Sequence, residues 1–143
     1  EGNILGIAHW GRDQLDKRLT VGAIEHLREK GYDPQSIKIA IAPGLGPEHH
    51  YIQEADLRKH IRNLWQWTGN VRFEEFKDER RYHLDLLCYL LDQLRDSGVS
   101  GGNIEAYGLD TYEAADRGDT FSLRYSNATG TPKGRMLIAA QLK

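Results

Sequence analysis

Residues 103–142 read NIEAYGLDTYEAADRGDTFSLRYSNATGTPKGRMLIAAQL, and this stretch decides the fold class. Three segments in it are rich in apolar, β-branched and aromatic residues and predict strands at residues 103–109, 120–125 and 135–142. Residues 126–134 are rich in Asn, Gly and Pro, which is typical of a hairpin loop. Consecutive strands with no helix between them favour an α+β protein over a doubly wound parallel sheet.

The residues before this stretch alternate strand-like segments with amphipathic helices. Short apolar segments at residues 4–8, 37–42 and 71–76 predict strands, and a helix is expected after each, the first beginning near Asp13 and the third ending near Gly98. The predicted order is β-α-β-α-β-α-β-β-β, an α+β fold with one mixed β-sheet and flanking helices. Each helix must bury its apolar face, and the residues expected in the core are Leu15, Leu19, Ala23, Leu27, Leu57, Ile61, Leu64, Leu87, Leu91 and Leu94.

Length and composition narrow the class of protein. The chain has 143 residues, which suits a single domain over residues 1–143. Its formal net charge is -2 and its Lys and Arg residues are scattered, which argues against a nucleic-acid-binding protein. No apolar segment approaches the roughly 20 residues that span a membrane, so no membrane partner is expected. The single cysteine, Cys88, forms no internal disulfide, and Glu1-Gly2-Asn3 does not resemble a secretory signal, so we expect a cytoplasmic protein.

Two histidine positions follow predicted strands, where α/β proteins often place ligands and catalytic groups. His9 comes directly after the first strand, although a single histidine there is more often structural. His49 and His50 follow the loop at residues 43–47, and their imidazoles suit zinc. Because two neighbouring side chains rarely reach one ion, solvated loop histidines are the favoured interpretation, with a metal site as the alternative.

The other candidate residues favour structural roles. Cys88 shares an apolar helical face with leucines, so it is expected to be buried and unreactive. His83 lies near the start of the third predicted helix and is expected to be a surface or capping residue. The loop at residues 43–47 lacks the Lys and the spacing of a phosphate-binding P-loop, and its prolines remove N–H donors, so it predicts a rigid turn.

Five segments resemble the motifs of a known family, in the same order. Residues 8–11 look like "AHAGWRG", and residues 41–47 look like "IGPSIGP". Residues 84–105 contain the series "DLW…QL…GV…NIE" at matching spacing. Residues 120–125 and 134–138 resemble the ending "FFSYRRD…TGRMA". This ordered series resembles the YfiH-like family, the laccase-domain proteins that are now regarded as purine nucleoside phosphorylases.

The resemblance implies a zinc site built from a His and a Cys of the family's N-terminal half and the His of "AHAGWRG". That last ligand corresponds to His9, so the resemblance makes His9 the catalytic and metal-ligating residue. It also makes Arg12 and Arg124 the substrate-binding residues. The resemblance covers roughly the last 60% of a typical member. The other zinc ligands are therefore expected from a preceding segment or a partner chain, and the implied substrates are a purine nucleoside and phosphate.

Several motif residues depart from the family pattern. Arg12-Asp13 stands where the family has Trp-Arg, Tyr125 replaces the second Arg of "YRRD", and Asp110 replaces the Cys of "CTY". Two functions therefore stay open. One is a zinc-dependent purine nucleoside phosphorylase or deaminase (polyphenol oxidation being the family's older assignment) whose active site is incomplete in these residues. The other is a divergent, non-catalytic binding or assembly module.

Overall fold

The computed structural model describes residues 4–67, 69–77 and 79–141. The helices are α1 (Arg12–Asp16), α2 (Leu19–Glu29), α3 (Glu54–His60), α4 (Leu86–Asp96), α5 (Thr111–Asp116) and α6 (Leu123–Thr129). The strands are β1 (Ile39–Ile41), β2 (Tyr51–Gln53), β3 (Val71–Phe76), β4 (Glu79–Leu84) and β5 (Ile104–Ala106). Three short 3₁₀ turns complete the list: η1 (Pro34–Ser36), η2 (Leu64–Trp67) and η3 (Gly101–Asn103). The α+β class is confirmed.

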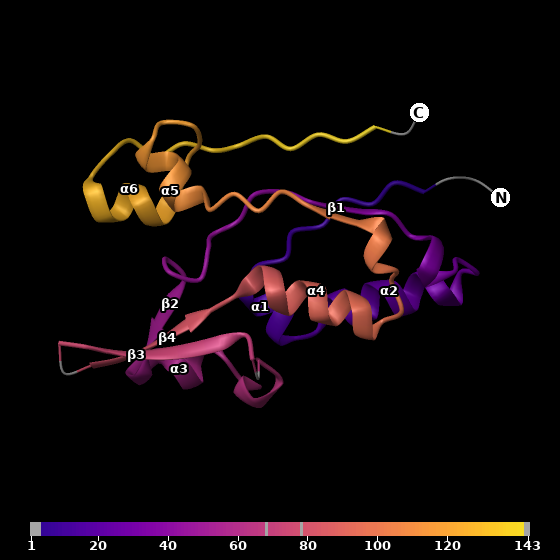
Figure 1. Cartoon of the computed structure of the whole chain (residues 1–143), viewed down its shortest axis with the longest axis horizontal. Helices are drawn as coiled ribbons and strands as arrows, with labels where there is room; N and C mark the ends of the chain where they lie inside the picture. Colours follow the sequence, from indigo (N-terminus) through magenta and orange to yellow (C-terminus); the bar gives the residue numbers. More distant parts are fainter. Residues whose placement is uncertain (1–3, 68, 78, 142–143) are drawn as a thin grey trace.

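The strands form two small sheets, so the prediction of one mixed sheet is wrong. β1 pairs with β5 in parallel, with Ile39 opposite Ile104. β2, β4 and β3 form a separate antiparallel sheet with β4 in the middle. Opposite charges face each other across β3 and β4, as in the pair Glu74 and Arg81, and such cross-strand pairs stabilise an antiparallel register. In Figure 1 the antiparallel sheet and α3 lie at one end of the molecule, and α5 and α6 form a separate pair.

The core lies where α1, α2 and α4 meet the antiparallel sheet. Leu15, Trp67 and Leu84 are fully buried, and the Trp67 ring lies 4.1 Å from the ring of Tyr89. The buried carboxylate of Asp16 accepts a hydrogen bond of 3.1 Å from Trp67 Nε1, so a charged group is satisfied inside this core. Figure 1 shows α4 lying beside α1 and α2. The antiparallel sheet next to these helices contains residues of the candidate site.

The buried helical faces differ from the predicted ones by about one residue. In α4 the side chain of Asp85 caps the helix by accepting a 2.9 Å hydrogen bond from the Cys88 backbone, and Tyr89 points into the core. The prediction that Cys88 is buried is therefore wrong, because Tyr89 packs on Trp67 and turns Cys88 to the surface. Of the ten residues predicted for the core, Leu15, Ile61 and Leu94 are buried, Leu27, Leu57, Leu64, Leu87 and Leu91 are half-buried, and Leu19 and Ala23 are exposed.

The first predicted strand and the first predicted helix also need correction. Residues 4–8 form no strand and are exposed, because no strand of the described chain pairs with them. The predicted helix from Asp13 is divided into α1 and α2 by Arg18, whose φ of 54° is left-handed. This break changes the phase of the following helix, so Thr20 and Ile24 of α2 are buried instead of Leu19.

The C-terminal strands are the largest error of the sequence prediction. Residues 123–129 form α6, and the side chain of Ser122 caps that helix by accepting a hydrogen bond from the Tyr125 backbone. Gly130 ends α6 with a φ of 74°, which replaces the predicted hairpin loop. Residues 131–141 are exposed and extended without strand pairing, and residue 142 of that prediction lies outside the described residues. Within the described residues, no helix has the length and apolar character needed to cross a membrane.

Candidate functional site

His50, at the start of β2, is the centre of the candidate site. Its side chain is largely buried, and its Nδ1 has no hydrogen-bond partner among the described residues. The pKa of His50 is lowered from 6.5 to about 4, mainly by burial and secondarily by the positive charges of Arg12 and Arg124, while a hydrogen bond with the Leu84 backbone opposes them. His50 is therefore a neutral imidazole at neutral pH, in a region of positive potential.

Arg12 reaches this region from the first turn of α1. That turn is ordered by Gln14, whose side chain accepts a 3.1 Å hydrogen bond from the Gly11 backbone. The Arg12 guanidinium donates to His60 Nδ1 at 3.2 Å and pairs with Asp13 at 3.1 Å. Since the Asp13 side chain is more than half exposed, this ion pair is weak and leaves most of the positive charge of Arg12 available.

Arg124 approaches His50 from α6. Its Nη2 donates a hydrogen bond of 3.2 Å to the Tyr51 carbonyl, and its guanidinium carbon lies 4.8 Å from the centre of the Tyr51 ring. Arg81 of β4 also contacts this ring, at 4.6 Å, and its buried Nε has no hydrogen-bond partner among the described residues. Arg124 forms no ion pair within the described part of the chain. Arg124 and Arg81 thus both contact Tyr51, and Arg12 and Arg124 both act electrostatically on His50. We call these three cationic side chains the arginine site.

His9 lies apart from any complete set of metal ligands. The residue is exposed, and its Nε2 would be 3.3 Å from a Cβ atom at Gly11, so the imidazole folds back toward the start of α1. Across residues 4–67, 69–77 and 79–141, no group of three potential ligand side chains includes His9. A catalytic zinc ion normally needs three protein ligands, so these residues do not by themselves fit the zinc site that the resemblance implies.

A second polar cluster lies beside the arginine site. His49 Nδ1 donates a hydrogen bond of 2.8 Å to Asp110 Oδ2, and the His49 ring stacks on Tyr112 at 3.9 Å with an interplanar angle of 8°. Burial alone would raise the pKa of Asp110, but hydrogen bonds from His49 and from the Tyr112 and Gly46 backbones hold that pKa below its usual value. The expectation of a solvated loop histidine is therefore wrong for His49.

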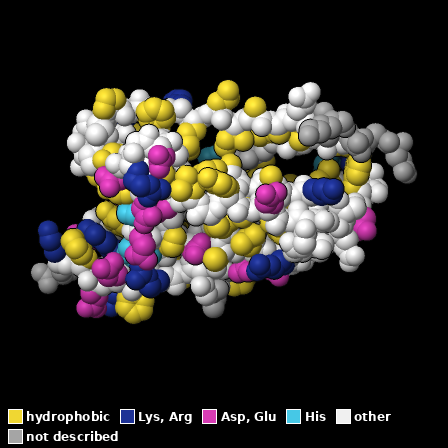
Figure 2. All heavy atoms as spheres, turned by 45° about the horizontal axis from the view of Figure 1, so that its top comes forward, with side chains coloured by type: hydrophobic (Ala, Val, Ile, Leu, Met, Phe, Trp, Pro, Cys, Tyr) yellow, Lys and Arg dark blue, Asp and Glu magenta, His cyan; other side chains and the backbone are white. Residues whose placement is uncertain are grey.

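His83 is also placed differently from its prediction. It lies on β4, is 5% exposed, and its ring nitrogens contact the Pro47 carbonyl at 2.9 Å and Glu74 Oε2 at 2.8 Å. It is therefore a buried residue that fastens the loop before β2 to the antiparallel sheet. In Figure 2 histidine side chains appear among interspersed acidic and basic side chains at one end of the molecule.

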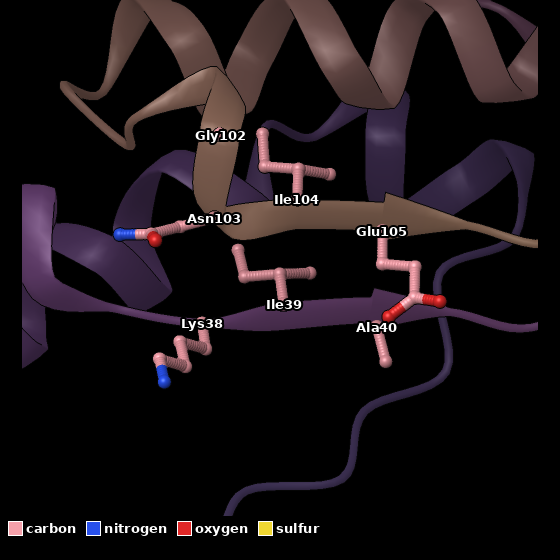
Figure 3. A pocket seen from close by; sticks show the side chains of 7 residues that line it. All are labelled: Lys38, Ile39, Ala40, Gly102, Asn103, Ile104 and Glu105. Carbon is pink, nitrogen blue, oxygen red and sulfur yellow. The ribbon is translucent and has the colours of Figure 1, made fainter.

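A hollow of about 420 Å³ lies along the parallel pair β1 and β5 (Figure 3). Its charged side chains are Lys38 and Glu105, and Figure 3 shows Ile39 in the space between the two strands and Ile104 on the other side of β5, toward the helices. None of the residues predicted for the site lines this hollow. We therefore place no chemistry there.

Comparisons with known proteins agree with the motif series. The model of the family described as multi-copper polyphenol oxidoreductase laccase matches residues 1–143. A solved structure, the hypothetical protein YfiH of Bacillus licheniformis, matches with a TM-score of 0.58 and 24% identity over 79% of this chain. That match covers 45% of the YfiH chain, so the present chain spans less than half of it. No protein of curated function matches. The chain thus belongs to the multi-copper polyphenol oxidoreductase laccase family, with a fold similar to that of YfiH.

Proposed function

We propose that the chain takes part in the phosphorolysis of purine nucleosides and that the arginine site binds the phosphate. One observation carries this proposal. Arg12 and Arg124 are 112 positions apart in the sequence, yet the positive charges of both lower the pKa of the same imidazole, that of His50. Two guanidinium groups that both act on one imidazole supply the positive charge and the N–H donors that favour a phosphate ion. The unpartnered Nδ1 of His50 supplies a further polar group there.

In this reaction a phosphate oxygen bonds to ribose C1′ while the bond from C1′ to the purine nitrogen breaks. The purine leaves with a proton, which gives the free base and ribose 1-phosphate. The role of Arg12 and Arg124 is to hold the phosphate anion and to offset its charge. Because no complete zinc ligand set includes His9 among the described residues, no step is assigned to zinc.

Phosphorolysis is favoured over deamination by this arrangement. Deamination uses an activated water and needs no anion site, whereas phosphorolysis consumes phosphate directly. A non-catalytic binding module is the second candidate, and the observation that favours it is the exposed His9 without partner ligands. Such a module could keep the arginine site and bind an anion without cleaving a nucleoside.

The first experiment is a titration of the chain with inorganic phosphate, followed by calorimetry or by NMR shifts of the arginine side chains. We expect Arg12→Met and Arg124→Met each to weaken phosphate binding at least tenfold, because each removes one of two charge-assisted contacts. Arg58→Met, on the exposed side of α3, is the matched control and should bind like the unaltered chain. Equal affinities in all four proteins would contradict the proposal.

The second experiment measures the release of purine base from inosine, adenosine and guanosine in phosphate buffer. Base release that requires phosphate and falls in both arginine variants supports phosphorolysis. Phosphate binding without base release, in a polypeptide that contains the complete family domain, would favour the binding module. Ammonia release from adenosine without phosphate would favour deamination instead.

A further inference from the structure

We propose that His49, Asp110 and Glu113 form a binding site for a divalent transition metal ion such as Zn²⁺, separate from His9. One possible ligand atom from each of the three residues lies within 4.8 Å of the other two. The residues come from two distant segments, the loop before β2 and the first turn of α5. An imidazole with two carboxylates is a donor set that suits Zn²⁺ and its first-row neighbours.

The distances fit an ion after small side-chain movements. Two ligands of a tetrahedral zinc ion lie roughly 3.3 Å apart, from metal–ligand distances of about 2.0–2.2 Å. His49 Nδ1 and Asp110 Oδ2 are 2.8 Å apart, so that pair would open slightly. Glu113 is exposed on α5, and a change of rotamer would bring its carboxylate closer. An ion there would keep one side open to solvent.

The charges of the cluster also point to a cation. Within the described residues Asp110 pairs with the His49 imidazole at 2.8 Å and with no Lys or Arg. Glu113 has no ion pair with Lys, Arg or His within the described part of the chain, although its carboxylate lies close to Asp110. A divalent ion would offset both carboxylates, because two acidic groups and a neutral imidazole carry a total charge of about -2.

Neighbouring groups already hold two of the ligands in position. Asp110 Oδ1 accepts a 2.8 Å hydrogen bond from the Tyr112 backbone, and this contact orients the carboxylate. The Tyr112 ring stacks on His49 and fixes the plane of the imidazole. Gly46 lies against the same carboxylate so closely that a Cβ atom there would collide with it. The second glycine of the Pro43–Pro47 loop is therefore needed for Asp110 to approach.

The test is a titration of the chelator-treated chain with Zn²⁺ by calorimetry and with Co²⁺ by visible absorption. We expect about one equivalent to bind, with a change in the His49 ring ¹⁵N NMR signals. Glu113→Gln changes an exposed side chain and should leave the fold intact while it weakens binding at least tenfold. Asp110→Asn should weaken binding at least as much, because the amide can still cap α5 but is a poor ligand.

Two matched controls separate this site from its surroundings. Glu48→Gln alters an exposed carboxylate next to His49 in sequence, and His9→Ala removes the histidine of the family motif. Both variants should bind the ion like the unaltered chain. Absence of stoichiometric binding, or equal binding in the Glu113 and Asp110 variants, overturns the proposal. Loss of binding in the His9 variant places the ion elsewhere and overturns it as well. Phosphate binding by the arginine site is measured separately, so either proposal can fail without the other.

Discussion

Acid should destabilise this protein through His50, and replacing His50 by Gln should remove that effect. The imidazole is buried and its pKa falls from 6.5 to about 4 because of burial and, secondarily, because of Arg12 and Arg124. The unfolded chain binds a proton at His50 below about pH 6.5, whereas the folded chain does so only below about pH 4. Stability is therefore lost as the pH falls through this range and is retained above it.

The size of the effect follows from the pKa shift. A shift from 6.5 to about 4 corresponds to about 3 kcal/mol of unfolding free energy once the pH is below both values. At about pH 5 the same relation gives a loss of about 2 kcal/mol relative to about pH 8. This loss is large against the 5–15 kcal/mol or so that stabilise a typical domain.

Urea unfolding at about pH 5 and about pH 8 measures the effect directly. The unaltered chain should lose about 2 kcal/mol more than His50→Gln between these two pH values. His26→Gln, which alters an exposed histidine of α2, is the control and should keep the full pH dependence. If His50→Gln loses as much stability in acid as the unaltered chain, the reasoning from burial and positive charge is refuted. Arg124→Met should show an intermediate slope, because one of the two charges is then absent.

Three further outcomes follow from the core and the helix ends. Asp16→Ala leaves Trp67 Nε1 without an acceptor and should cost about 2–4 kcal/mol in urea unfolding, while Asp13→Ala, at an exposed carboxylate, should cost less than about 0.5 kcal/mol. Native Cys88 should react with a thiol reagent without unfolding, and protection until unfolding would contradict its exposed position. The reaction should need a higher pH than that of a free thiol, because partial desolvation and the nearby Asp85 carboxylate raise the pKa of Cys88 and the thiolate is the reactive form. Gly98→Ala should cost about 1 kcal/mol because φ is 89° there, and an unchanged melting temperature would refute that strain.

Local patterns predicted the elements whose partners lie close in sequence. The strand predicted at residues 71–76 coincides with β3, which forms a hairpin with the next strand. The helix that contains Leu94 was also predicted, because its apolar spacing is regular and Gly98 follows it. β4 was missed because its first three residues are all charged and its last two, His83 and Leu84, were assigned to the start of that helix. Local sequence signals thus predicted that these helices and strands exist more accurately than they predicted the residues at which each begins and ends.

Tertiary partners explain most of the errors. Met136, Leu137 and Ile138 have the composition of a strand, yet a strand needs a neighbour, and none pairs with them among the described residues. The exposure of Cys88 depends on the packing of Tyr89 against Trp67, a contact that no spacing rule contains. Such contacts decide which side of an amphipathic helix faces the core.

The site residues divide in the same way. Arg12 and Arg124 could be named from the resemblance alone, but their common effect on His50 could not, because the only sequence signal at His50 was its place after the loop at residues 43–47. The pairing of His49 with Asp110 joins residues 61 positions apart. The available signal was weak: an Asp directly after a predicted strand and a histidine after a Gly/Pro loop. Only the folded chain shows that these groups meet.

His49 and His50 are consecutive in the chain, yet they belong to different clusters, and this arrangement makes the loop before β2 the structural link between them. His49 contacts Asp110 and Tyr112 of the α5 segment. The pKa of His50, in contrast, is lowered in part by the positive charges of Arg12 and Arg124. The loop is fastened at several points, since the Gly44 carbonyl accepts a 2.8 Å hydrogen bond from the Thr111 backbone and the Pro47 carbonyl lies against buried His83. Its two prolines fix φ, so little freedom remains between these anchors. A ligand that orders the His49 cluster would therefore also restrict the position of His50, and the two proposed sites would share one rigid element of the fold.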